Sequence, residues 1–116
     1  TALTTIWNFF ETAYKTLISA GFEPQNIYLD PGIGFGKNDH ANIQLLAEVQ
    51  NFSKKYNIAI GLSRKAFIGR CWNIENPINR DPISKALELS MIMMGAKIIR
   101  THNVLNLVKL KQMLQS

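Results

Sequence analysis

The sequence predicts an α/β protein in which an N-terminal helix is followed by three β–α units, an α(βα)3 arrangement with three parallel strands. Two observations lead to this fold class. Apolar residues recur at helical spacing in four segments, and three short apolar runs separate those segments. The runs begin about 31 and 39 residues apart, which suits right-handed crossover connections between parallel strands.

The first helix is predicted over residues 3–18, and Gly21 can end it. Its apolar positions fall on one face: Leu3, Ile6, Trp7, Phe10, Tyr14, Leu17 and Ile18. The first strand follows at residues 27–29, between a Pro-Gln-Asn segment and a Pro-Gly pair. This short, wholly apolar run is typical of a strand that is buried on both faces.

The second helix is predicted over residues 42–56 and the second strand over residues 58–62. A less regular stretch at 73–81 precedes a third helix over 82–94, which ends at Gly95. That helix has one mainly apolar side, made of Ile83, Leu87, Ser90, Met91 and Met94. The third strand is expected at 97–100, and a closing helix is marked by Val104, Leu107, Val108 and Leu114.

Length and composition indicate one globular unit. The chain has 116 residues, of which 47% are hydrophobic, enough for a packed core. No run approaches the roughly 20 apolar residues of a membrane helix, and the N-terminus lacks the features of a signal peptide. The single cysteine, Cys71, cannot form an internal disulfide, so we interpret it as structural and expect a cytoplasmic protein.

The charge balance favours anionic ligands. Thirteen Lys and Arg residues against eight Asp and Glu residues give a net charge of +5. The basic residues are scattered and do not alternate with aromatic residues, so a nucleic acid partner is not favoured. His40 has no obvious partner in the sequence and is expected at the surface.

Polar residues follow each predicted strand. Asp30 opens the loop DPGIGFGKN, Ser63 and Lys65 lie in GLSRKAFIG, and Arg100 and His102 lie in IIRTHNV. Parallel α/β proteins bind ligands beyond the carboxyl ends of their strands. We therefore expect these three loops to form one pocket.

The glycine-rich first loop is not a known phosphate loop. Gly32, Gly34 and Gly36 leave the backbone free to adopt positive φ and to approach a ligand closely. Their spacing fits neither the Walker A pattern nor the dinucleotide fingerprint. Asp30 could accept hydrogen bonds from the amino and ring N–H groups of a pterin or guanine, and it could equally cap the following turn.

The other two loops favour polar and anionic groups. Lys65 could reach a ring carbonyl or nitrogen and Ser63 offers a hydroxyl, although Ser63, Arg64 and Lys65 could instead form a solvated basic turn. Arg100 and His102 alternate about Thr101, so in extended backbone both side chains point the same way. Together they would form a clamp for phosphate oxygens.

Taken in this order, DPGIGFGKN, GLSRKAFIG and IIRTHNV resemble the dihydropteroate synthases of the pterin-binding family. The resemblance covers essentially residues 1–116, and it implies the C-terminal portion of a pterin-binding TIM (β/α)8 barrel domain, from the helix before the sixth strand onward. It implies a transferase of folate biosynthesis, the target of sulfonamides. Such an enzyme condenses p-aminobenzoate with 6-hydroxymethyl-7,8-dihydropterin diphosphate, giving dihydropteroate and pyrophosphate.

The resemblance also implies roles for the pterin-binding residues. Asp30 would hydrogen-bond the pterin amino and ring nitrogens, and Lys65 would contact the pterin carbonyl and a ring nitrogen. Gly34 and Gly61 would leave room for the flat ring.

The remaining implied roles concern the second substrate and the leaving group. Phe35 and Ser63 would border p-aminobenzoate, while Arg100 and His102 would hold the diphosphate and, with Lys65, act in catalysis. Mg²⁺ is expected with the diphosphate, mainly through residues absent from this chain, and no metal ligand is predicted within it. Two positions depart from the family pattern: Ala66 stands where Ser is frequent, and Asn103 where Asp is frequent.

Two alternatives stay open. One is a methyltetrahydrofolate-dependent methyltransferase of the same superfamily, which would have no use for a diphosphate clamp. The other is a non-catalytic half-barrel that acts by association through its open sheet edges. We expect the chain alone to be an inactive fragment, and its parent protein to be a homodimer that binds small-molecule substrates and no membrane.

Overall fold

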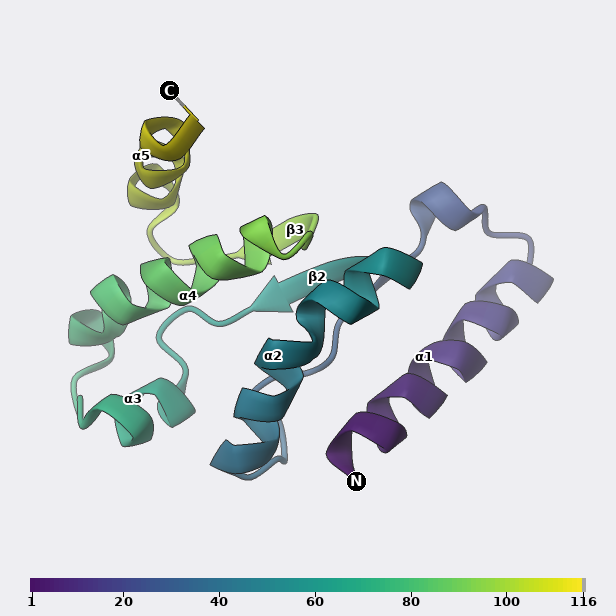
Figure 1. Ribbon diagram of the computed structural model, residues 1–116, viewed down its shortest axis with the longest axis horizontal. Helices are drawn as coiled ribbons and strands as arrows, with labels where there is room; N and C mark the ends of the chain where they lie inside the picture. Colours follow the sequence, from purple (N-terminus) through teal and green to yellow (C-terminus); the bar gives the residue numbers. More distant parts are fainter. Residues whose placement is uncertain (116) are drawn as a thin grey trace.

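The computed structural model describes residues 1–115 and places five α-helices around a three-stranded parallel sheet (Figure 1). The strand order is β1-β2-β3, so β2 pairs with a neighbour on each side. The elements are α1 (Ala2–Ser19), β1 (Tyr28–Leu29), α2 (Asp39–Lys55), β2 (Asn57–Gly61), α3 (Ala66–Trp72), α4 (Asp81–Met93), β3 (Ile98–Arg100) and α5 (Val104–Gln115), with short 3-10 helices η1 (Pro24–Asn26) and η2 (Pro77–Arg80). The predicted α(βα)3 order and the parallel pairing are confirmed.

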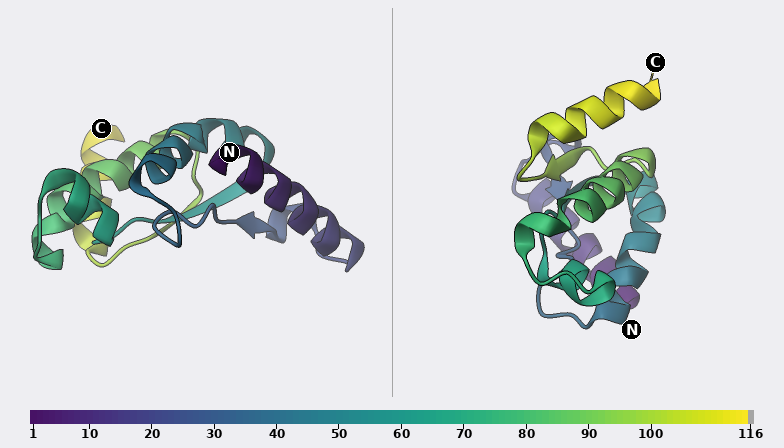
Figure 2. Two further views of the ribbon diagram at one scale, coloured as in Figure 1. Left: turned by 90° about the horizontal axis from the view of Figure 1, so that it is seen from below. Right: turned by 90° about the vertical axis from the view of Figure 1, so that its left-hand side faces the viewer.

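The helices cover one face of the sheet. Figures 1 and 2 show α1, α2 and α4 in one layer against the strands, with α5 beside α4 at the β3 edge. Ile58 and Ile60 of β2 are fully buried, whereas Tyr28 of β1 and Ile98 of β3 are 44% and 40% exposed. The prediction that the first strand is buried on both faces is therefore wrong for Tyr28, because the helices of this chain cover only one side of the strands.

Aromatic side chains hold α1 against α2. The ring centroid of Phe10 lies 5.1 Å from that of Phe52 and 5.7 Å from that of Tyr56, both in edge-on geometry. Trp7 packs on Phe52 at 4.6 Å and donates a 2.9 Å hydrogen bond from Nε1 to Glu48 Oε2. Edge-on aromatic pairs add to the stabilisation that burial already gives, so this cluster anchors α1 to the sheet layer.

The predicted boundaries lie close to the observed ones, with the largest difference at the start of α2. The apolar pattern predicts a start at residue 42, but the helix begins at Asp39. Asn38 caps it, because its Oδ1 accepts a 2.7 Å hydrogen bond from the Ala41 amide. The polar first turn adds no apolar periodicity, and the sequence pattern therefore misses it.

Two features of the second half of the chain were not predicted. The seven-residue α3 is too short to show a helical stripe, although Phe67 and Ile68 are buried. In α4 the buried residues besides Met91 are polar: Ser84, Lys85 and Glu88. The side predicted to face the core is only partly buried at its apolar positions Ile83, Leu87 and Met94.

Two side chains considered in the sequence analysis, His40 and Cys71, both lie at the surface. His40 is exposed, as predicted. Cys71 is also exposed, on α3, so it is not a core residue. Within residues 1–115, no helix combines the length and the apolarity needed to cross a membrane.

The aromatic cluster gives a stability prediction with an internal control. Phe10→Ala should lower the free energy of unfolding by about 3–5 kcal/mol, because Phe10 is fully buried among aromatic rings. Phe9→Ala, one residue earlier and 56% exposed, should change it by less than about 1 kcal/mol. Urea unfolding followed by circular dichroism measures both, and equal losses would contradict the described packing of α1.

Candidate functional site

The three loops meet at the carboxyl ends of the strands, as predicted. The register Gly61↔Arg100 places the ends of β2 and β3 side by side, whereas β1 ends at Leu29 beside Ile58, near the start of β2. A pocket of about 300 Å³ lies there, lined by Gly61, Ser63, Lys65, Arg100, Thr101 and His102. Asp30 reaches the same place, since Arg100 Nη2 donates a 2.8 Å hydrogen bond to Asp30 Oδ2 across 70 residues of sequence.

Asp30 makes two kinds of contact. Its Oδ1 accepts a 2.8 Å hydrogen bond from the Gly32 amide, which is the turn-capping arrangement. Its Oδ2 pairs with Arg100, and the two side chains are 34% and 61% exposed. The turn-capping interpretation of Asp30 is therefore confirmed, while its second carboxylate oxygen is held by Arg100 beside the pocket and its role toward a pterin stays a prediction.

The glycine loop is held by residues that the sequence did not single out. All three of its glycines have positive φ, between 63° and 88°. The Gly34 amide donates a 2.8 Å hydrogen bond to Oδ1 of Asn42, a fully buried residue of α2. Lys37 closes the loop, because its Nζ donates to the carbonyls of Gly32 at 2.9 Å and Phe35 at 3.1 Å. The one sequence feature that could have indicated this role is the position of Asn42, a polar residue on the inward side of a predicted helix.

Gly34 and Gly61 make room for two long cationic side chains. A Cβ at Gly34 would lie 2.7 Å from Lys65 Cδ, and a Cβ at Gly61 would lie 2.6 Å from Arg100 Nη2. Lys65 Nζ sits 3.8 Å from the centroid of the Phe35 ring, a cation–π contact. The space expected for a flat ring beside these glycines is filled by Lys65 and Arg100, so such a ring could enter only after one of them has moved.

Lys65 is electrostatically unusual. Its partial burial lowers the pKa of the ammonium group, and the nearby positive charge of Arg100 lowers it further. The Asp30 carboxylate acts in the opposite direction. The pocket thus places two cations close together with one compensating carboxylate, an arrangement that an additional anion would stabilise.

Ser63 fixes the loop that follows β3. Its Oγ accepts a 3.0 Å hydrogen bond from the His102 amide and lies 2.8 Å from His102 Nδ1. Arg100 and His102 line one pocket, as predicted, but each is held by a different partner. The clamp therefore lies in one segment at the end of β3, which is tied to the loop after β1 through Asp30 and to the loop after β2 through Ser63.

Arg64 has a structural role. It is a non-glycine residue with φ of 57°, and its guanidinium pairs with both carboxylate oxygens of Asp81 at 2.8 and 3.1 Å. Its amide donates a 3.0 Å hydrogen bond to Ser84 Oγ, and its carbonyl accepts one from Arg80 Nη1 at 3.0 Å. These contacts stabilise the left-handed backbone conformation of Arg64, which is unfavourable for a residue other than glycine. The alternative of a solvated basic turn is therefore wrong for Arg64.

The loop after β3 is also tied to α4. Thr101 Oγ1 lies 2.5 Å from Lys85 Nζ and donates a 3.0 Å hydrogen bond to Glu88 Oε1. Lys85 Nζ and Glu88 Oε1 form a buried ion pair at 2.7 Å. This pair could not be predicted from the sequence, because charged residues in a helix are usually solvated.

The described residues do not supply a metal site of their own. Residues 1–115 contain no group of three or more His, Cys, Asp or Glu side chains placed to bind an ion. Both oxygens of Asp30 are already engaged. The donor set therefore does not fit a Mg²⁺ ion held by this chain alone.

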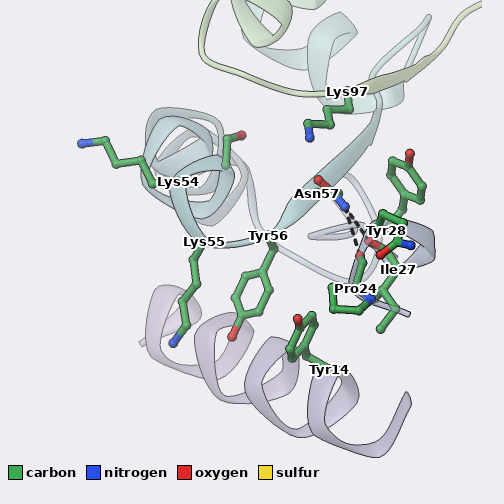
Figure 3. Close-up of a pocket in the computed structure, with 11 residues that line it drawn as sticks. Tyr14, Pro24, Ile27, Tyr28, Lys54, Lys55, Tyr56, Asn57 and Lys97 are labelled. Carbon is green, nitrogen blue, oxygen red and sulfur yellow. Dashed lines mark hydrogen bonds between the residues drawn. The ribbon is translucent and has the colours of Figure 1, made fainter. Parts of the chain in front are cut away.

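A larger pocket, of about 590 Å³, lies at the opposite, amino ends of the strands (Figure 3). There the side-chain Nδ2 of Asn57 donates to the carbonyls of Pro24 at 3.3 Å and Ile27 at 3.2 Å, which ties β2 to η1. Tyr56 in its wall belongs to the buried aromatic cluster, and its lysines are exposed. These contacts are structural, and the amino ends of parallel strands are not where such folds bind substrates.

The charge balance at Lys65 can be tested by titration. Arg100→Ala removes a positive neighbour and should raise the pKa of Lys65 toward its ordinary value of 10.5, whereas Asp30→Asn removes an attraction and should lower it further. NMR titration of ¹³C-labelled lysine measures both shifts. Lys15, which pairs with Glu11 on α1, serves as the control and should not respond. Shifts in the same direction would contradict the described geometry.

Known proteins are similar to this chain in both sequence and fold. The family model for pterin binding enzymes matches residues 1–102. The dihydropteroate synthase of Bacillus subtilis is 34% identical over 103 residues, which are 88% of this chain and 36% of that protein. The enzyme of Escherichia coli K12 is 37% identical over 98 residues, which are 84% of this chain and 34% of that protein. The chain thus spans about a third of the length of these curated relatives.

Solved structures give the same result. The dihydropteroate synthase of Xanthomonas albilineans with 4-aminobenzoic acid is 30% identical and has a TM-score of 0.93, over 98% of this chain and 42% of that chain. The Yersinia pestis dihydropteroate synthase is 34% identical with a TM-score of 0.89, over 99% of this chain and 54% of that chain. These neighbours are TIM barrels, so the α(βα)3 arrangement is that of a partial (β/α)8 barrel. With a family match from residue 1 to residue 102, the chain belongs to the pterin binding enzyme family.

Proposed function

We propose that the protein to which this chain contributes is a dihydropteroate synthase, which joins p-aminobenzoate to 6-hydroxymethyl-7,8-dihydropterin diphosphate and releases pyrophosphate. The observation that carries the proposal is the contact between Asp30 and Arg100. It places a carboxylate suited to the pterin and a guanidinium suited to the diphosphate in one pocket. The relatives described above, all named dihydropteroate synthases, support the same activity.

The residues present suit a reaction without a protein nucleophile. The bond between the pterin methylene carbon and the diphosphate oxygen breaks, and the amino nitrogen of p-aminobenzoate bonds to that carbon and loses a proton. Arg100 and His102 would stabilise the negative charge that develops on the leaving pyrophosphate. Asp30 and Lys65 would hold the pterin ring, the first through its amino and ring N–H groups and the second through its carbonyl.

Substrate binding would rearrange the ion pair that closes the pocket. Arg100 now holds one oxygen of Asp30 and lies against Gly61. A diphosphate offers Arg100 a stronger anionic partner. When Arg100 turns to the diphosphate, Asp30 is free to bind the pterin. The same movement empties the space beside Gly61, which is where the ring would lie.

The second substrate would lie toward the loop tips. Phe35 is 62% exposed, so its ring is available beside Lys65, and Ser63 lies at the pocket wall. The two departures from the family pattern fall outside these contacts. Ala66 begins α3, and Asn103 caps α5 by accepting a 3.2 Å hydrogen bond from the Asn106 amide. Asn and Asp are comparable caps, so Asn103 preserves that role.

Some parts of the proposal depend on portions of the protein outside this chain. Mg²⁺ would accompany the diphosphate and take its protein ligands from elsewhere, since the described residues offer no set of their own. A cytoplasmic location and a homodimeric assembly are proposed with the activity. The methyltransferase alternative is less well supported, because a pairing of Arg100 with His102 has no use without a diphosphate.

Calorimetry tests the proposal directly. We would titrate the dihydropterin diphosphate with Mg²⁺ into residues 1–116 alone and into a complete barrel containing them, and assay the barrel for dihydropteroate. Binding and turnover in the complete barrel, with neither in the isolated chain, are expected because the missing strands supply the rest of the site. A folded barrel that binds no pterin diphosphate would refute the proposal. Binding of methyltetrahydrofolate without the diphosphate would favour the methyltransferase.

Variants separate the two halves of the site. In the complete barrel, Lys65→Ala should weaken binding of the bare pterin more than that of pyrophosphate, and Arg100→Ala should do the reverse. Each loss should be about tenfold or more, the effect of one charge-assisted hydrogen bond. Cys71→Ser, at an exposed position of α3, is the control and should leave both affinities unchanged. A reversed order would show that the roles are wrongly assigned.

A further inference from the structure

The buried ion pair on α4 has no part in the proposed reaction. Lys85 is 4% exposed and Glu88 is fully buried, and the two groups meet at 2.7 Å. Taking two charges out of water is costly, and their attraction seldom repays more than that cost. Apolar residues of similar size would fill the same space at least as favourably. The pair therefore requires an explanation other than stability.

The hydrogen bonding of Glu88 strengthens this point. Its Oε1 accepts hydrogen bonds from Lys85 and from Thr101. Its Oε2 is buried and has no hydrogen-bond partner among the described residues. A half-satisfied buried carboxylate destabilises a fold, and natural proteins break such local rules mainly at functional sites.

Among residues 1–115, Thr101 is the only residue outside α4 that forms a hydrogen bond with this pair, and it separates the two residues of the clamp. The Thr101 hydroxyl contacts Lys85 at 2.5 Å and Glu88 at 3.0 Å. On either side of it, Arg100 contacts the loop after β1 and His102 contacts the loop after β2. The backbone of this tripeptide is thus fixed from the helix layer at its centre, while its outer side chains face the pocket.

We propose that Lys85 and Glu88 are positioning residues for anion binding, which act through Thr101 to hold Arg100 and His102 in the orientation that receives a diphosphate. The inference rests on the proposed function for the identity of the anion. The geometry also explains why a charged pair is used here. Three polar groups with directional bonds fix the rotation of Thr101, which an apolar contact would leave free.

The same helix supports the neighbouring loop. One turn earlier on α4, Asp81 and Ser84 hold the side chain and the amide of Arg64. Residues 81, 84, 85 and 88 recur at helical spacing, so one side of α4 carries the contacts to both loops. Lys65 directly follows Arg64, and Thr101 lies within the clamp. α4 therefore sets where Lys65 and the clamp lie relative to one another.

The first test uses one position of the complete barrel and two substitutions. Thr101→Val keeps the shape and removes the hydroxyl, whereas Thr101→Ser keeps the hydroxyl. Thr101→Val should weaken pyrophosphate binding about tenfold while binding of the bare pterin stays unchanged. Thr101→Ser should retain the pyrophosphate affinity of the unmodified protein. This split between two ligands separates positioning from a general loss of structure.

The second test replaces the pair itself. Lys85→Met combined with Glu88→Leu should leave the thermal unfolding midpoint unchanged or raised, because an apolar pair avoids the desolvation cost. It should nevertheless weaken pyrophosphate binding about tenfold. The matched control is Lys15→Met combined with Glu11→Leu, which removes an exposed pair on α1 and should leave the affinity unchanged.

The outcomes distinguish this inference from the proposed function. If the unmodified complete barrel binds no pyrophosphate, the proposed function fails. If it binds pyrophosphate and Thr101→Val binds equally well, the positioning role fails. If the double variant on α4 does not fold, the comparison of Thr101→Val with Thr101→Ser still tests the positioning role.

Discussion

The parallel pairing of β2 with both of its neighbours is the constraint on which the rest of the structure depends. It brings the carboxyl ends of three strands, which are far apart in sequence, to one edge of the sheet. The loops that carry the candidate site begin at this edge. Gly61 stands directly beside Arg100, so the side chain at 100 can cross the end of β2 and reach Asp30. A shift of one residue would turn Arg100 to the other face of the sheet.

The polar and charged side chains of the pocket are held by contacts within the protein. Arg100 is paired with Asp30, Lys65 rests on the Phe35 ring, and the Ser63 hydroxyl is occupied by His102. None of these contacts is strong, because the ion pair is exposed to water and a surface pair contributes at most about 1 kcal/mol. A multiply charged anion can therefore replace them at small cost. The site is kept in order by weak contacts that a ligand can exchange for stronger ones.

Much of this structure could be predicted from the sequence, and the exceptions have a common cause. Helical periodicity and short apolar runs located four helices and three strands, and the loop motifs located the pocket. The pattern did not reveal α3, whose seven residues span too few turns for a stripe, or the buried Asn42, Lys85 and Glu88. Polar residues at inward positions are read as solvent-facing by any rule based on hydrophobicity. Their true place depends on partners such as Gly34 and Thr101, which are distant in sequence.

These unpredicted polar residues form a layer between the core and the pocket. Asn42 holds the glycine loop, Ser84 holds the turn at Arg64, and Lys85 with Glu88 holds Thr101. Each is buried and belongs to a helix, while each partner lies in a loop at the carboxyl ends of the strands. Loops alone are too mobile to fix a charged side chain, whereas a buried hydrogen bond to a packed helix transmits the rigidity of the core. The helices α2 and α4 therefore do more than cover the sheet: their buried polar groups set where each loop presents its ligand-binding residues.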